Sequence, residues 1–443
     1  MTLAQRLAWF EAGSTLAIVG VTAAFTLPPT AEPLPSLAPR ILVIASICVA
    51  ALYFNDLYNF ELPHDFHNLF GRVCRALGWS ALLLAVTYVA FPTTSLPGNL
   101  VSPALIMLLA AVIVIRVAVY GLAKCAPFSE RVVIVGAGGL ARELGHQIRT
   151  RPDLTLRLVG FVGEPATGPT LGGYADVEGV VDHHRADRII VAMPDRRGRL
   201  PVKALLACRV RGVQIEEGTE VFERLTRRLA VESLTPSALV FCDGFRVTGA
   251  RLFIKRMLSV AIAAMALAIS APFLAVVALL IKLESPGPAF FIQDRVGFRG
   301  RTFRLIKFRT MRVISTAPGD TVIRDNRSRV TRLGQVLRRY RLDEIPQFIN
   351  ILRGDMSLVG PRPEMAENVD TFSAVIPFYD LRHEVRPGLT GWAQVRSGYS
   401  MSLEEVTRKL CYDLYYIKHM SIAFDLRILF DTVKFVLSGK KPG

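Results

Sequence analysis

An uncharged segment of 22 residues, from position 260 to position 281, most limits what this chain can fold into. It is long enough for one helix to cross a bilayer core, which takes roughly 20 residues. Basic side chains flank it on both sides, at Arg251, Lys255, Arg256 and Lys282. Because basic flanks stay in the cytoplasm, both ends are expected on one side of the membrane. Pro272 removes a backbone hydrogen bond near the middle, so we predict a re-entrant helix over about 257–281 with Pro272 as its hinge; a kinked transmembrane helix is the alternative.

The first third of the chain holds four more apolar stretches of about membrane-spanning length, at residues 9–27, 41–57, 76–91 and 103–120. If all four cross the membrane, the basic residues at their ends concentrate on one side, which places both ends of the bundle in the cytoplasm. The sequence therefore predicts a membrane α-helical bundle, a four-helix transmembrane domain, over residues 1–125.

The positive charge is concentrated in one block. The chain has 53 Lys and Arg against 37 Asp and Glu, a net charge of +16, yet 51% of its residues are hydrophobic. This combination argues against an ordinary soluble enzyme. Residues 251–345 hold 18 basic and 6 acidic residues, an excess of 12 out of the 16. Such a block favours a phosphate partner; nucleic acid fits least, because no motif for reading bases accompanies it and an apolar segment lies beside it.

The middle of the chain shows the pattern of a Rossmann-like α/β domain. Residues 131–135 read as a buried strand, followed by a turn that contains Gly136, Gly138 and Gly139 and then by a helix. More strand-like runs occur at 156–162, 188–193 and 212–215, so we predict a small parallel α/β domain over 131–245. The three glycines are candidate nucleotide-binding residues, but the same turn also suits close strand–helix packing, and a structural or regulatory domain is the favoured interpretation.

An acidic pair stands alone among arginines in the last third. Asp343 and Glu344 are the only acids between Asp325 and Asp355, whereas seven arginines lie between positions 327 and 353. Neighbouring guanidiniums are expected to keep a carboxylate ionised, and a carboxylate can serve as a ligand of Mg²⁺. Arginines also suit the oxygens of a diphosphate. The chemistry leaves open phosphoryl transfer through an aspartyl intermediate, a solvated salt-bridge face and lipid-head-group binding.

Four short motifs follow one another in this part of the chain. They are Lys-Phe-Arg at 307–309, Arg338 followed by the Asp343-Glu344 pair, Pro-Arg-Pro at 361–363 and Arg-Pro-Gly at 386–388. From residue 251 onward the chain resembles the bacterial sugar transferases, the monotopic phosphoglycosyl transferases. Over its full length it resembles their large form, the exopolysaccharide polyprenyl glycosylphosphotransferases. The resemblance implies a mostly α-helical catalytic domain over 251–443 with the re-entrant membrane helix.

The resemblance also implies an activity. Such enzymes move a hexose-1-phosphate from a UDP-sugar to undecaprenyl phosphate, release UMP and require Mg²⁺, as the first step of exopolysaccharide or O-antigen assembly. Asp343 matches the nucleophile that forms a covalent phosphosugar-aspartate, and Glu344 matches the second acid, which supports Mg²⁺ or proton handling. The protein is then a multi-pass protein of the bacterial inner membrane with a cytoplasmic catalytic domain. The specific sugar is not implied.

Further site residues carry over from the family. The matching phosphate- or nucleotide-binding residues are Lys307, Arg309, Arg338 and Arg362, and the late acids grouped with them are Asp413 and Asp425. The middle domain resembles one associated with dimer contacts, which suggests a homodimer. One departure is that Ala271, where members often have Ser, precedes Pro272. Two other functions stay open: a nucleotide-sugar dehydratase with NAD in the middle domain, and a basic scaffold that binds anionic lipid.

Overall fold

The computed structural model describes residues 34–55, 66–92, 130–151, 156–164, 169–193, 198–233, 248–313, 329–397 and 402–438, with isolated positions between them. The chain divides into two compact units, Met1–Gly218 and Thr219–Gly443. The division lies earlier than position 245, where the sequence pattern suggests the middle domain ends. We describe each unit by itself.

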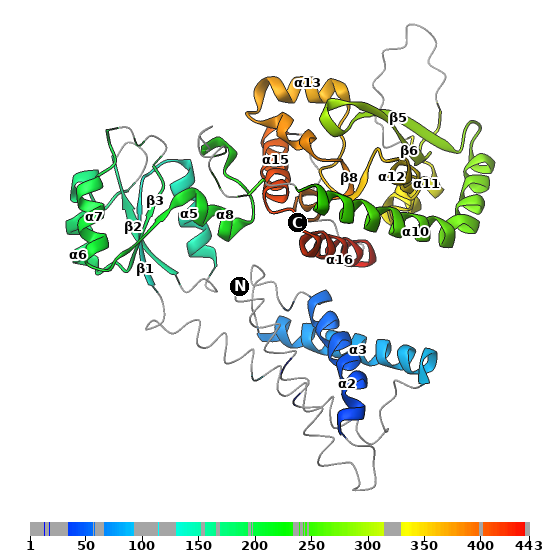
Figure 1. The fold of residues 1–443 in the computed structure, drawn as a ribbon, viewed down its shortest axis with the longest axis horizontal. Helices are drawn as coiled ribbons and strands as arrows, with labels where there is room; N and C mark the ends of the chain where they lie inside the picture. Colours follow the sequence, from blue (N-terminus) through cyan, green and yellow to red (C-terminus); the bar gives the residue numbers. More distant parts are fainter. Residues whose placement is uncertain are drawn as a thin grey trace. The chain divides into compact units, whose positions relative to one another are not determined.

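Two apolar helices belong to the first unit. These are α2 (Leu34–Phe54) and α3 (Phe66–Ala90), which pack against each other (Figure 1). They coincide with two of the four predicted membrane segments, while the other two, 9–27 and 103–120, fall largely outside the described residues. Within α3 the stretch Val73–Ala90 is long and apolar enough to cross a membrane, and the apolar part of α2, Leu42–Phe54, is shorter.

The predicted parallel α/β fold is confirmed in the same unit. Its four parallel strands have the order β2-β1-β3-β4, with bounds β1 Glu130–Val135, β2 Leu156–Val162, β3 Arg188–Val191 and β4 Gln214–Glu217. The helices between them are α5 Gly139–Thr150, α6 Val177–His184 and α7 Val202–Val210. Val133 and Val135 of β1 are fully buried, because parallel strands are covered on both faces.

Packing alone accounts for one glycine of the Gly-rich turn. Gly136 follows β1 with a φ of +128°, which side-chain-bearing residues rarely adopt. A Cβ atom there would lie 2.4 Å from the carbonyl oxygen of Ala192. Gly138 then precedes α5 and Gly139 begins it. The close approach of β1 and the end of β3 therefore requires Gly136 whether or not a ligand binds.

The second unit begins with a short helix and a connector. Helix α8 (Gly218–Thr226) follows β4 directly. After it, Leu229 and Val231 are buried in the core of this unit, and the indole Nε1 of Trp392 donates to the carbonyl of Arg227 at 3.0 Å. The segment 227–231 is thus packed into the core of the second unit.

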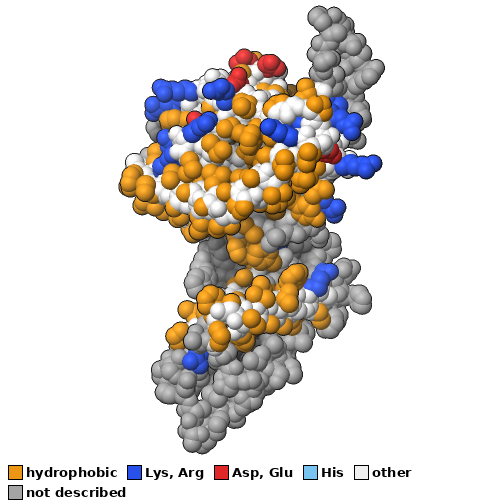
Figure 2. All heavy atoms as spheres, turned by 90° about the vertical axis from the view of Figure 1, so that its right-hand side faces the viewer, with side chains coloured by type: hydrophobic (Ala, Val, Ile, Leu, Met, Phe, Trp, Pro, Cys, Tyr) orange, Lys and Arg blue, Asp and Glu red, His pale blue; other side chains and the backbone are white. Residues whose placement is uncertain are grey.

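Helix α10 (Gly249–Glu284) is one apolar helix of 36 residues with Pro272 inside it. The ribbon bends part-way along α10 (Figure 1), and the missing N–H of Pro272 is the physical cause of a bend there. Ser270, two residues before the proline, donates its hydroxyl to the carbonyl of Ala266 at 2.6 Å. Figure 2 views this side of the molecule and shows hydrophobic side chains over much of it, with Lys and Arg around them.

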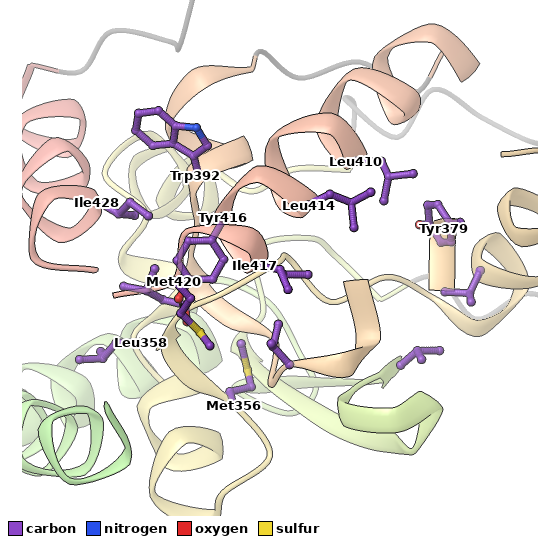
Figure 3. Close-up of a cluster of buried hydrophobic side chains, with 14 of the residues drawn as sticks. Met356, Leu358, Tyr379, Trp392, Leu410, Leu414, Tyr416, Ile417, Met420 and Ile428 are labelled. Carbon is purple, nitrogen blue, oxygen red and sulfur yellow. The ribbon is translucent and has the colours of Figure 1, made fainter. Parts of the chain in front are cut away.

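The remaining elements of this unit follow α10 in the chain. An antiparallel hairpin follows it, formed by β5 (Phe290–Val296) and β6 (Thr302–Phe308). The chain continues through α11 Arg332–Arg339, η8 Leu342–Glu344, α12 Gln347–Arg353, β7 Ser357–Val359, α13 Ala366–Val375, η9 Tyr379–Glu384, β8 Gly388–Thr390, α14 Trp392–Arg396, α15 Leu403–Lys418 and α16 Ile422–Ser438. Figure 3 shows the core, in which Leu410, Leu414 and Ile417 of α15 pack with residues of the neighbouring elements.

Candidate active site

A short turn carries the acidic pair. Helix α11 is capped at its start by Thr331, whose hydroxyl oxygen accepts from the N–H of Gly334 at 2.9 Å. After this helix Arg341 adopts a φ of +54° and redirects the chain into the 3₁₀ turn η8. Successive side chains in such a turn point roughly 120° apart. Asp343 and Glu344 therefore face different surroundings.

Three basic side chains lie around Glu344. Its side chain is buried, with 9% exposed. Nη2 of Arg362 lies 2.8 Å from Oε1, Nζ of Lys307 lies 3.6 Å from Oε1, and Nη1 of Arg341 lies 3.6 Å from Oε2. Burial alone would raise the pKa of Glu344, but the charges of Arg362 and Lys307 outweigh it and lower the pKa to about 2. Glu344 is therefore an anion at every physiological pH.

Asp343 is in a different state from its neighbour. It is partly exposed and forms no ion pair with any residue that the structure describes. Burial, together with the negative charge of Glu344, raises the pKa of Asp343 to about 6, against the opposing charges of Lys307 and Arg338. The sequence suggested that nearby guanidiniums would keep this carboxylate ionised; in the structure Lys307, Arg341 and Arg362 pair with Glu344. Asp343 remains mostly ionised at neutral pH.

Lys307 reaches the site from β6, which is held in place by a buried amide. Oδ1 of Asn350 accepts from the N–H of Ile306 at 3.1 Å, and its Nδ2 donates to the carbonyl of Arg304 at 2.7 Å. Burial and the charge of Arg362 lower the pKa of Lys307, with Glu344 opposing them. Sequence reasoning missed Asn350, although a lone amide in the apolar run Phe-Ile-Asn-Ile-Leu is a detectable signal.

Arg338 and Arg309 are placed differently from each other. Arg338 projects from the end of α11, and its Nε donates to the hydroxyl of Thr310 at 2.8 Å. Arg309 lies just beyond β6, where the chain turns toward α10. Its buried guanidinium donates to three carbonyls at the end of α10, those of Ile281, Ser285 and Pro286. The hydrogen bonds of Arg309 thus hold the end of a helix, which differs from the phosphate-binding role suggested by its motif.

The two late acids are buried in separate ion pairs. Asp413 of α15 accepts from Nη2 of Arg382 at 2.9 Å, and the same nitrogen donates to the carbonyl of Arg362 at 2.9 Å. Asp425 of α16 pairs with Nζ of Lys255 at 2.9 Å and accepts from the hydroxyl of Tyr416 at 2.6 Å. Asp413 is therefore linked to Glu344 through Arg382 and Arg362, and Asp425 connects α16 to the start of α10.

A magnesium ion fits one carboxylate better than two. No group of three or more His, Cys, Asp and Glu side chains forms a metal cage in the described part of the chain. Glu344 already has three cations around it, whereas the carboxylate oxygens of Asp343 form no ion pair within the described part of the chain. Mg²⁺ commonly uses one or two carboxylates together with substrate phosphates and waters. The residues therefore fit an ion held by Asp343 and a bound diphosphate.

Comparison with known proteins identifies the family. The sequence model described as bacterial sugar transferase matches residues 250–439, which begin at α10 and include the acidic pair. A UDP-glucose:undecaprenyl-phosphate glucose-1-phosphate transferase of Escherichia coli is 35% identical over 69% of this chain and 68% of its own length. The chain belongs to the bacterial sugar transferase family.

Other relatives are similar to the chain over shorter stretches. A UDP-N-acetylgalactosamine-undecaprenyl-phosphate N-acetylgalactosaminephosphotransferase of Aeromonas hydrophila is 42% identical over 53% of this chain, which spans 55% of that relative's length. An exopolysaccharide production protein of Rhizobium leguminosarum is 41% identical over 41% of this chain and 94% of its own length. A second sequence model, described as a CoA-binding domain, matches residues 54–216, which include the Gly-rich turn.

Proposed function

We propose that this protein transfers a hexose-1-phosphate from a UDP-sugar to undecaprenyl phosphate and releases UMP. The step would initiate a glycan of the exopolysaccharide or O-antigen type. The observation that carries the proposal is the different surroundings of the two acids. Glu344 pairs with Lys307, Arg341 and Arg362, whereas Asp343 forms no ion pair with the residues that the structure describes. The relatives' names, which describe sugar phosphate transfer to undecaprenyl phosphate, support it.

The first half of the reaction uses Asp343 as nucleophile. An oxygen of its carboxylate attacks the phosphorus atom bonded to the sugar, and a new P–O bond to Asp343 forms. The bond between that phosphorus and the bridging oxygen breaks, so UMP leaves with the electron pair. Lys307, Arg338 and Arg362 supply positive charge around the diphosphate, where negative charge moves from one oxygen to another in the transition state.

The second half restores the enzyme. A phosphate oxygen of undecaprenyl phosphate attacks the same phosphorus, forms the diphosphate linkage and displaces the carboxylate of Asp343. A carboxylate with a pKa of about 6 suits both roles, because it is ionised for attack at neutral pH and is a competent leaving group. When bound by Asp343 and the substrate phosphates, Mg²⁺ would neutralise negative charge on the transferred group.

Two sets of variants test this chemistry. Asp343→Asn is expected to abolish UMP release, whereas Asp294→Asn, which alters an exposed acid of β5, should leave it unchanged. Unchanged UMP release in the Asp343 variant would reject the proposal. The relatives' names include both glucose and N-acetylgalactosamine, so a panel of UDP-sugars in the same assay identifies the donor.

For the membrane arrangement, we propose a multi-pass protein of the bacterial inner membrane with α10 re-entrant from the cytoplasmic side. Exposed Arg251 and Lys282, near the two ends of α10, would then lie on one side. Single cysteines at these two positions, in a chain without its six native cysteines, should both react with an impermeant thiol reagent in inside-out vesicles. Reaction from opposite sides would show that α10 crosses the membrane.

A homodimer, expected from the middle domain, is tested by measuring the mass of the protein in detergent.

A further inference from the structure

Strand β5 exposes three consecutive large apolar side chains. Phe290 is 43% exposed, Phe291 48% and Ile292 54%. Successive side chains of a strand point to opposite faces, so a strand that covers a core usually buries every second residue. At this end of β5 both faces are open instead. Contiguous exposed apolar surface of this kind marks a binding surface.

Phe290, Phe291 and Ile292 form an apolar strip, and one face of this strip lies beside the candidate active site. Phe291 lies directly opposite Lys307 in the hairpin, so the two side chains project from the same face. Nζ of Lys307 lies 3.6 Å from Oε1 of Glu344. An exposed aromatic ring is therefore the immediate neighbour of a cation of the site.

The other face of the strip is continuous with α10. The ring of Phe290 stacks on that of Phe308 with centroids 5.3 Å apart. Phe308 is buried in a cluster with Val277 and Ile281 of α10, and Leu342, the residue before Asp343, packs against the same cluster. Exposed apolar side chains continue along this half of α10, at Phe273, Val276 and Leu280. Asp343 thus follows directly on a residue that packs against the same buried cluster as Phe308 and the second half of α10.

We propose that Phe290, Phe291 and Ile292 bind the hydrocarbon chain of the lipid phosphate acceptor next to its phosphate. This inference rests on the proposed function and assigns a subsite to its second substrate. An amphiphile needs an apolar surface that ends at a cation, and the strip ends at Lys307. Bulk bilayer lipid and a second copy of the chain are the competing occupants, but neither accounts for the side-by-side position of Phe291 and Lys307.

Direct binding tests the subsite without turnover. In full-length protein carrying Asp343→Asn, Phe291→Ser is expected to weaken retention of radiolabelled undecaprenyl phosphate in detergent about tenfold, as the loss of a half-buried Phe contact suggests. Phe291→Leu, which keeps an apolar side chain, should restore binding. Leu403→Ser, at an exposed leucine of α15, is the matched control and should bind normally. Equal retention by all variants would overturn the proposal.

The two half-reactions separate this inference from the proposed function. With Asp343 present, UMP released without acceptor reports the first half, and transfer of the retained phosphosugar to undecaprenyl phosphate reports the second. Phe291→Ser should slow the second half about tenfold relative to the first. Absence of UMP release from the unaltered protein would refute the proposed function, while the binding measurement still decides the subsite. Two other outcomes would also overturn the proposal, if the ratio of the two half-reaction rates and the binding of undecaprenyl phosphate stay unchanged. Loss of vesicle association would assign the strip to bilayer lipid, and a change in oligomeric state would assign it to a second copy of the chain.

Discussion

Nη2 of Arg362 donates a hydrogen bond to Oε1 of Glu344 at 2.8 Å, across the buried side of the acidic pair. This contact joins the Pro-Arg-Pro segment to the turn that carries Asp343. It also places the charge of Arg362 on Glu344, and Arg362 forms no ion pair with Asp343. Two carboxylates adjacent in sequence consequently have pKa values on opposite sides of their usual range.

Removal of Arg362 should therefore weaken the fold as well as the site. Arg362→Gln leaves Glu344 buried with fewer cations, and we expect it to lower the free energy of unfolding by about 3 kcal/mol. The double variant with Glu344→Gln should lose less stability than the sum of the single variants, because no buried charge is left behind. Thermal unfolding measures both effects, and strictly additive losses would contradict a direct pair.

The pH dependence of the first half-reaction should report Asp343. Its attack requires the ionised carboxylate, so the rate of UMP release should rise with pH until Asp343 is ionised. Bound Mg²⁺ favours the ionised form, which places the midpoint at or below the value of about 6 set by the protein alone. Glu344, with a pKa of about 2, does not titrate in this range. Lys307→Gln removes a positive charge that favours the ionised form, so the midpoint should move to higher pH. Arg301→Gln, at an exposed residue of the hairpin turn, serves as the control and should leave the midpoint unchanged. A midpoint that moves to lower pH in the Lys307 variant would contradict the assignment to Asp343.

Asp413 should act on catalysis through Arg382 and the backbone of Arg362. Asp413→Asn leaves the Arg382 guanidinium buried without its anion, so we expect a loss of about 3 kcal/mol in stability and a lower kcat. Asp425→Asn is the matched control, because it breaks another buried ion pair of the same unit that does not reach Arg362. Both variants should unfold at lower temperature, and only the first should lose kcat at temperatures where both are folded. Equal effects on kcat would assign Asp413 a purely structural role.

Arg309 should matter for stability more than for the donor substrate. Arg309→Gln removes hydrogen bonds to carbonyls at the end of α10, where each charged bond contributes about 2 kcal/mol. We expect a lower unfolding temperature with an unchanged KM for the UDP-sugar in the folded fraction. A raised KM without loss of stability would return Arg309 to the phosphate-binding role that its motif suggests.

The sequence predicted those features that depend on local pattern. The length and charge of the segment 260–281 identified α10 as one apolar helix with a proline near its middle, because helix length and backbone hydrogen bonding are local properties. The short apolar runs around the Gly-rich turn identified the parallel sheet for the same reason. The isolation of Asp343 and Glu344 among arginines singled them out as candidate site residues, since that imbalance is visible in the chain itself.

Only the tertiary structure decided which of the two acids forms ion pairs with the described cations. Glu344 meets Lys307 from β6 and Arg362 from the segment after β7, and these contacts depend on how separate elements pack. The same holds for Arg309, which turns back to the end of α10 although it lies only two residues after Lys307. Ionic interactions and burial act over a few ångströms in space, so residues distant in sequence set the charge state of Asp343.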